Sequence, residues 1–406
     1  MEFHQFTLAN GIRVIFKDTN REVAHCGLVI NAGSRDEKPH EEGLAHFIEH
    51  SIFKGTSKRK TYHILSRLDS VGAEINAYTS KEETWVYSSF VNAHFDRATE
   101  LIADICFNSI FPEKEIKKEK DVIIDEINAY QDSPSEQIFD DIEEVVFSGH
   151  PLGRNILGTE ASVKSFTREH IFEFIGRRYK TDQMVFSVVG NFSLKTVKRI
   201  AEKYLGQFPS NLSNDTRLPF NGYKPIDVNQ AKDTHQVHYV VGVEAYHSGH
   251  ENQTGLVLLN NYLGGPGMNS RLNLMIREKH GIAYNIESHY QGYSDTGLLE
   301  IYLGTDAKSF EKSKKLLFTE LKKLREKKLG IAQIHSAKQQ LIGQIALGQE
   351  SGAGTMLALG KSLLLYDRVD TLEQVFQRID QVTSAEILEI SNQIFDPERL
   401  SSVTYK

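Results

Sequence analysis

The chain has 406 residues, of which 40% are hydrophobic and 25% charged, enough for two domains with separate cores. The net charge is −7 with no long basic run, which argues against nucleic acid as a partner. No stretch approaches a membrane span, and the first residues lack a basic and then apolar leader, so we expect a cytoplasmic protein without a membrane partner. Cys26 and Cys106 are too few for a disulfide framework, and we expect both to be buried core residues.

The amino-terminal part opens with a β-rich stretch at residues 11–16, and residues 43–53 then predict a helix. This helix carries His46, Glu49 and His50 in the pattern H-x-x-E-H, the inverse of the H-E-x-x-H zinc-protease motif. Residues four apart lie one above the other on a helix, so the two imidazoles can bind one metal ion, with Glu49 toward the same side. Two histidines and a glutamate on a solvated helix face are the alternative interpretation.

Residues 72–79 and 84–90 predict a β-hairpin, because β-branched and aromatic residues flank a short polar turn. An edge strand has unpaired N–H and C=O groups to which an extended peptide can add.

A second helix is predicted around residues 119–131, where Val122, Ile123, Ile124, Ile127 and Tyr130 form an apolar stripe. Glu119 and Glu126 are seven residues apart, so both lie close to the buried face. A carboxylate there is costly unless it is paired or binds a cation. A catalytic zinc ion needs three protein ligands, so a carboxylate of this helix is a candidate for the third.

These residues resemble the pitrilysin, insulysin and mitochondrial processing peptidase group of inverzincin metallopeptidases, in its short bacterial form. The resemblance implies that His46, His50 and Glu126 bind one Zn²⁺ ion, that Glu49 is the general base, and that Glu119 supports a ligand histidine. Further matches lie at residues 31–37, 53–56, 76–79 and 150–153. In the family an Asn-Ala pair lines the cleft, so Asn76 and Ala77 are candidates for substrate binding; the alternative is that Asn76 caps a turn.

The chain divides near its middle, where residues 209–222 are polar, contain proline and lack periodicity. We expect a zinc-binding half at residues 1–208, a linker at 209–232 and a homologous half at 233–406. Residues 255–262 and 344–351 align with the two metal-site helices of the first half. The aligned metal-site positions hold Leu258, Asn261, Tyr262 and Gln344, so the second half is predicted to keep the fold and lack the metal.

Residues 277–284 of the second half resemble the family segment R-E-x-x-G-L-A-Y, with Ile282 in place of leucine. The resemblance implies that Arg277 and Tyr284 reach across the cleft to the scissile peptide. A guanidinium and a phenol are suitable donors to a tetrahedral oxyanion. The alternative is an ordinary arginine and tyrosine packed at a helix-to-strand turn.

The expected fold is α+β, with two homologous α/β halves, each a mostly antiparallel sheet flanked by helices, that face each other around a cleft. The expected function is a zinc-dependent endopeptidase that hydrolyses unfolded peptides, acting as a homodimer. Some relatives are non-catalytic scaffolding or partner subunits, which is the second hypothesis. Such chains typically lose a ligand or the base, and none is lost here.

Overall fold

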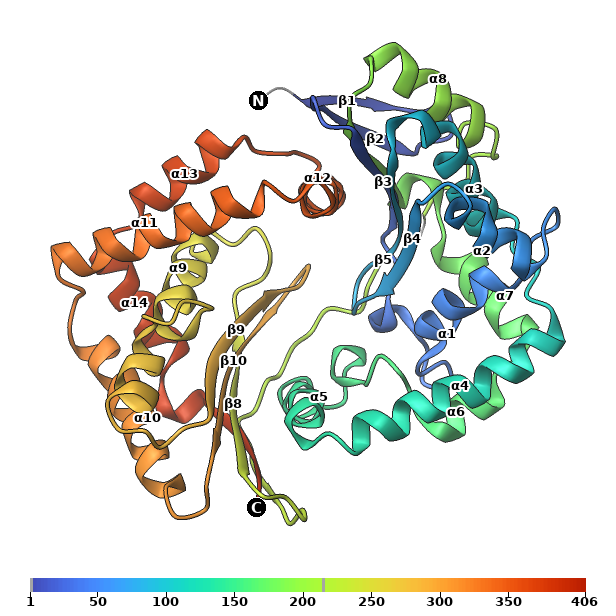
Figure 1. Ribbon diagram of the computed structural model, residues 1–406. Coiled ribbons are helices and arrows are strands. Elements are labelled where there is room, and N and C mark those ends of the chain that lie inside the picture. Colours follow the sequence, from blue (N-terminus) through green and yellow to red (C-terminus); the bar gives the residue numbers. More distant parts are fainter. Residues whose placement is uncertain (1–2, 214–215) are drawn as a thin grey trace. The chain divides into compact units, whose positions relative to one another are not determined.

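The computed structural model describes residues 3–213 and 216–406 (Figure 1). Its contacts divide the chain into two compact units. Unit 1 comprises residues 1–128, 154–217 and 347–369, and unit 2 comprises residues 129–153, 218–346 and 370–406. Within the described ranges, no helix is both long and apolar enough to cross a bilayer.

Unit 1 is built on a mixed sheet whose strand order is β1-β2-β6-β3-β5-β4. Its strands are β1 (Phe3–Thr7), β2 (Arg13–Asp18), β3 (Val23–Ile30), β4 (Glu74–Thr79), β5 (Thr84–Val91) and β6 (Met184–Gly190). All neighbours are antiparallel except β2 and β6, which are parallel. Its helices are α1 (Leu44–Ser51), α2 (Thr61–Asp69), α3 (Phe95–Phe107), most of α4 (Glu113–Gln131), α6 (Glu160–Ser165), α7 (Arg168–Arg178), α8 (Leu194–Tyr204) and α12 (Gly352–Tyr366). Strand β4 forms one edge of this sheet.

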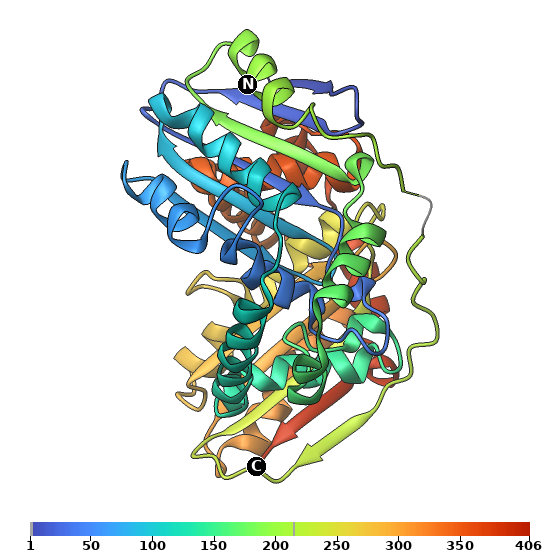
Figure 2. The ribbon, with the colours of Figure 1, turned by 90° about the vertical axis from the view of Figure 1, so that its right-hand side faces the viewer.

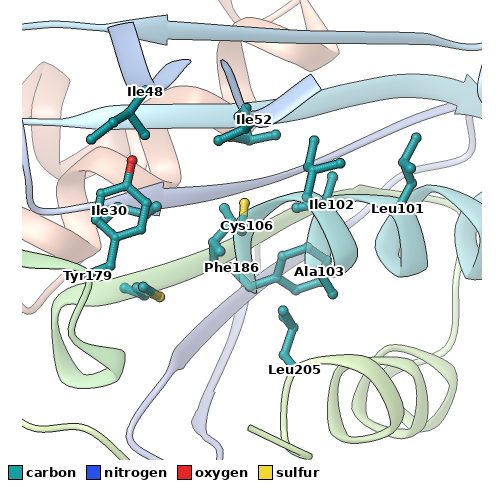
Figure 3. Close-up of a cluster of buried hydrophobic side chains, with 14 of the residues drawn as sticks. Ile30, Ile48, Ile52, Leu101, Ile102, Ala103, Cys106, Tyr179, Phe186 and Leu205 are labelled. Atoms are coloured by element: carbon teal, nitrogen blue, oxygen red, sulfur yellow. The ribbon is translucent and has the colours of Figure 1, made fainter. Parts of the chain in front are cut away.

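The main core of unit 1 lies between the sheet and the helices α1, α3, α7 and α8. Figure 3 shows Ile48 of α1 and Ile52, which directly follows α1, in one cluster with Ile102 and Cys106 of α3. Cys26 is buried in the same core, so both cysteines are buried as predicted. This packing fixes one face of α1 and leaves its opposite face for polar side chains.

Unit 2 has the strand order β7-β11-β8-β10-β9, which repeats the order β2-β6-β3-β5-β4 of unit 1. Its strands are β7 (Asp227–Gln230), β8 (Val237–Ala245), β9 (Asn285–Gly292), β10 (Gly297–Thr305) and β11 (Ser401–Tyr405). The pair β7 and β11 is parallel, like β2 and β6, and Figure 2 shows β11 in red beside β7. Its helices are α5 (Pro134–Val146), α9 (Gln253–Gly264), α10 (Phe310–Glu326), most of α11 (Ile331–Gly348), α13 (Leu372–Gln381) and α14 (Ser384–Ile394). The predicted α+β architecture with two homologous, mostly antiparallel sheets is confirmed.

One helix from each half of the sequence packs on the sheet that the other half of the sequence forms. Helix α12 contacts β6 and β3 of unit 1, and α5 contacts β8 and β11 of unit 2. Side chains of a strand alternate between its faces. Val29 of β3 therefore faces the α12 cluster, whereas Leu28 and Ile30 face the main core. Each sheet is thus covered by its own helices on one face and by one exchanged helix on the other.

A glycine in the central strand of each sheet allows the exchanged helix to approach. A Cβ atom built at Gly27 would lie 3.1 Å from the sulfur of Met356 in α12. A Cβ atom at Gly242 would lie 2.4 Å from a side-chain carbon of Ile142 in α5. The two exchanged contacts are therefore equivalent in the two repeats.

The observed elements agree closely with those predicted from the sequence, with two differences. Val122 and Tyr130 of α4 are exposed, so the buried stripe of this helix is narrower than predicted and consists of Ile116, Glu119, Ile123 and Ile127. The compact units also differ from the predicted halves, because residues 129–153 and 347–369 each join the other unit. Within the predicted linker, residues 214 and 215 lie outside the described part of the chain.

Candidate active site

Helix α1 presents its functional side chains because its opposite face is fixed in the core. Leu44, Phe47 and Ile48 are fully buried. His46 and His50 lie one turn apart on the other face, with ring centroids 4.6 Å apart. Glu49 is half-buried and lies on the same side, three residues from His46. The predicted H-x-x-E-H helix is therefore present, with its three polar residues directed away from the core.

Helix α4 brings a carboxylate to the two imidazoles. The Oε2 atom of Glu126 lies 3.7 Å from Nε2 of His46 and 3.7 Å from Nε2 of His50. One ligand atom from each of the three residues lies within 4.8 Å of the others. Tetrahedral zinc with ligand bonds near 2.0–2.2 Å separates neighbouring ligand atoms by roughly 3.4 Å. Two imidazole nitrogens and a carboxylate oxygen at these distances fit a divalent metal ion.

The two histidines differ in their surroundings. Burial, with a smaller effect of His50, lowers the pKa of His46 to about 4, so its ring is neutral near pH 7. Burial also acts to lower the pKa of His50, but the hydrogen bond to Glu119 and the nearby carboxylates outweigh it and raise that pKa. A metal ion would therefore compete with a proton mainly at His50.

Glu119 links His50 to a cation. Its Oε1 atom lies 3.0 Å from Nδ1 of His50, and its Oε2 atom lies 2.7 Å from Nζ of Lys54. Burial alone would raise the pKa of Glu119, but His50 and Lys54 lower it in net. The carboxylate can therefore accept a hydrogen bond from Nδ1–H of His50, which leaves Nε2 without a proton and available to bind a metal ion.

Glu49 is placed to act as a base. Burial raises the pKa of its carboxyl group above the usual value, against the opposing effects of Thr79 and His50. Thr79 is the last residue of the edge strand β4. A carboxylate with a raised pKa is a better proton acceptor near neutral pH than an ordinary glutamate.

The candidate substrate residues Asn76 and Ala77 lie in the middle of β4 and pair with Tyr87 and Val86 of β5. Asn76 is therefore in a strand rather than at a turn, which removes the interpretation as a turn cap. Strand β4 lies at the edge of its sheet and contacts α1. A free strand edge thus runs beside the metal-site helix within the same unit.

Arg277 and Tyr284 belong to unit 2. Arg277 lies in a π-helix, Asn273–Glu278, and lines a pocket of about 490 Å³ along β9. Tyr284 is 61% exposed and directly precedes β9. Both side chains are exposed, so neither is packed into a turn as the alternative interpretation requires. A contact of this pair with the first unit stays a prediction.

The equivalent helices of unit 2 offer no such cluster. Leu258 and Asn261 of α9 are buried, and the hydroxyl of Tyr262 accepts a hydrogen bond from Arg271. Among the described residues, the only group of histidine, cysteine and acidic side chains spaced to hold a metal is the one in unit 1.

Lys54 and Glu37 contact the site region, and neither was singled out from the sequence. Both lie in segments that match the family, at residues 53–56 and 31–37. Lys54 contacts Glu119, which is 65 positions later in the chain, and Glu37 contacts the start of α1. No periodicity indicates pairings of this kind, which depend on how α1, α4 and the preceding loop pack.

Comparison with known proteins identifies the family. The model of the insulinase family, peptidase family M16, matches residues 13–160, and the model of the peptidase M16 inactive domain matches residues 165–341. The chain is 34% identical over 393 residues to an uncharacterized zinc protease of Bacillus subtilis, YmxG, covering 96% of this chain and 95% of that one. The chain belongs to peptidase family M16.

A further relative and two solved structures are similar to the chain over most of its length. An uncharacterized zinc protease of Rickettsia bellii is 33% identical and covers 93% of this chain and 90% of its own. A protease of Helicobacter pylori has a similar crystal structure, with a TM-score of 0.91 at 22% identity, covering 100% of this chain and 99% of that one. A Pseudomonas fluorescens structure described as a peptidase M16 inactive domain gives a TM-score of 0.93 at 18% identity, with coverages of 100% and 98%. The structural likenesses support the fold.

Proposed function

We propose that this M16 protein is a zinc-dependent endopeptidase that hydrolyses unfolded peptides. The observation that carries the proposal is the convergence of His46, His50 and Glu126 from two helices, with Glu49 on the same face of α1. The names of the relatives, zinc proteases, support the choice of metal.

His46, His50 and Glu126 would hold the ion. When bound, zinc supplies a Lewis acid that polarises a carbonyl and lowers the pKa of water. Glu49 accepts the proton of the attacking water and passes it to the leaving amine, a task suited to its raised pKa. Glu119 and Lys54 hold the ring of His50 in the orientation that directs Nε2 toward Glu126.

The free edge of β4 suits an extended peptide as substrate. Backbone N–H and C=O groups of the edge pair with any sequence, so side chains such as Asn76 add only limited selectivity. A folded protein does not offer an extended segment, so unfolded peptides are the proposed substrates. Arg277 and Tyr284 are the proposed donors to the oxyanion that forms on water attack.

The alternative, a non-catalytic subunit of the same fold, requires a defect in the site. Every residue needed for metal binding and proton transfer is present, so nothing in unit 1 favours it. We further propose a cytoplasmic homodimer that does not bind nucleic acid; light scattering of the purified chain tests the dimer.

The proposed activity is tested by digesting a library of unfolded peptides and identifying the cut sites by mass spectrometry. The zinc-loaded protein should cut peptides of a few tens of residues. The same protein stripped by a chelator should not, and zinc should restore cutting. A folded domain containing a cut sequence is the matched control and should stay intact. No cleavage by fully zinc-loaded protein would favour the non-catalytic alternative.

A further inference from the structure

The N-cap residue of helix α1 provides no side-chain hydrogen bond to the first turn of the helix. The N-cap residue is Gly43, with a φ of +89° and no side chain to accept a hydrogen bond. A larger residue does not fit, because a Cβ atom there would lie 2.4 Å from the carbonyl oxygen of Leu157. The first N–H groups of a helix need acceptors from outside it.

Glu37, six residues before the N-cap, supplies the missing acceptors. Its Oε2 atom accepts the N–H of Gly43 at 3.0 Å, and its Oε1 atom accepts the N–H of Ala45 at 2.8 Å. The residue is 4% exposed. Burial raises the pKa of Glu37 well above its usual value, and these two N–H groups oppose that effect. A buried carboxylate is costly unless it is hydrogen-bonded. The two N–H groups at the start of α1 supply one hydrogen bond to each oxygen of Glu37.

The backbone around Glu37 is itself held in place. Arg154 donates a hydrogen bond to the carbonyl oxygen of Glu37 at 3.0 Å and forms an ion pair with Glu42 at 3.3 Å. The backbone of the residue that supplies the acceptors is therefore tied to a segment outside α1.

Ala45 directly precedes the first histidine of the metal group. A helix of this length has only two turns, so a change in the direction of its first turn moves His46 relative to His50 and Glu126. We propose that Glu37 is a positioning residue that sets the orientation of α1 and thereby the geometry of the metal-binding group. This inference rests on the proposed metal site, but not on the proposed hydrolysis.

Metal binding provides the test. In Glu37→Gln one carboxylate oxygen becomes an NH₂ group, which faces a backbone N–H as a second donor, so one of the two bonds is lost. We expect the zinc affinity, measured by competition with a chelator, to fall by about tenfold or more, in the range seen for groups that orient metal ligands. The visible absorption spectrum of the Co²⁺-loaded variant, which reports ligand geometry, should also change.

The matched control is Glu41→Gln. Glu41 is a carboxylate of the same loop, 1% exposed, and its side chain accepts the N–H of Lys38 but no N–H of α1. Both variants should lower the Tm of the metal-free protein, but only Glu37→Gln should change metal affinity and the Co²⁺ spectrum. If Glu37→Gln does not fold, Glu37→Asp, which keeps a carboxylate at a shorter reach, is measured in the same way.

Wild-type zinc affinity and an unchanged Co²⁺ spectrum in the folded Glu37 variant would overturn the inference. An equal loss of affinity in both variants would also overturn it, because it would show a general effect of loosening the loop. These readouts do not require peptidase activity. A protein that cuts no peptide but shows the expected spectral change would refute the proposed function and leave the role of Glu37 standing.

Discussion

Glu119 and Glu126 lie two turns apart on α4 but face different partners. Glu126 faces Nε2 of both histidines, whereas Glu119 contacts only Nδ1 of His50 and the ammonium group of Lys54. We therefore expect Glu126→Gln to lose zinc almost completely, because it removes a charged ligand. Glu119→Gln should weaken zinc affinity by roughly 10–100-fold through the orientation of His50. Equal zinc contents by elemental analysis, at limiting zinc, would contradict these assignments.

The raised pKa of His50 predicts how zinc binding depends on pH. Zinc must displace the proton of His50, so affinity is full above the raised pKa and falls about tenfold per pH unit below it. The loss should begin above pH 6.5, and His46 should add to it only near pH 4. In Glu119→Gln the onset should move to lower pH, because Glu119 helps to raise the pKa of His50. Chelator competition at several pH values measures the pH at which zinc affinity begins to fall. If that pH is the same in Glu119→Gln as in the wild type, Glu119 does not raise the pKa of His50.

At the scale of the elements, each exchanged helix depends on close contact with a strand. In Gly27→Val the new Cβ atom would lie 2.7 Å from Cβ of Tyr87 and 3.1 Å from the sulfur of Met356. Such overpacking costs about 1–3 kcal/mol, so we expect a lower Tm. Gly176→Ala in α7 is the control, because its added Cβ atom would meet no atom within 4 Å apart from the neighbouring backbone of its own helix, and alanine is a better helix former than glycine. If both variants had the wild-type Tm, α12 would not pack tightly on β3.

The sequence predicted the elements that have a clear period or motif. The helix with His46 and His50, the hairpin with Asn76 and the β-rich stretch at residues 11–16 are found within a few residues of their predicted positions. The stripe of α4 was predicted too wide, since Val122 looks like a core residue but faces solvent. The exchange of α5 and α12 could not be predicted, because hydrophobic patterns show that a helix face is buried but not which sheet covers it.

At the scale of the whole molecule, the exchange means that neither half of the sequence contains a complete unit. A fragment of residues 1–217 lacks α12, which covers Trp85, the only tryptophan of the chain. We expect this fragment to unfold at a lower temperature than the full chain and to show red-shifted tryptophan emission. Attaching residues 345–370 through a flexible linker should restore a blue-shifted emission. A fragment with the full-length emission maximum and Tm without α12 would contradict the interpretation of the exchanged helix.

The proposal of zinc-dependent hydrolysis is tested most directly with Glu49→Gln. The substitution leaves His46, His50 and Glu126 in place but removes the group that accepts a proton. The variant and the wild type are loaded to equal zinc content, verified by elemental analysis, and turnover of an unfolded fluorogenic peptide is measured. We predict hydrolysis by the wild type and a loss of kcat of at least ~10²-fold in the variant. Near-wild-type turnover in the zinc-loaded variant, or none in the wild type, would contradict the proposed mechanism.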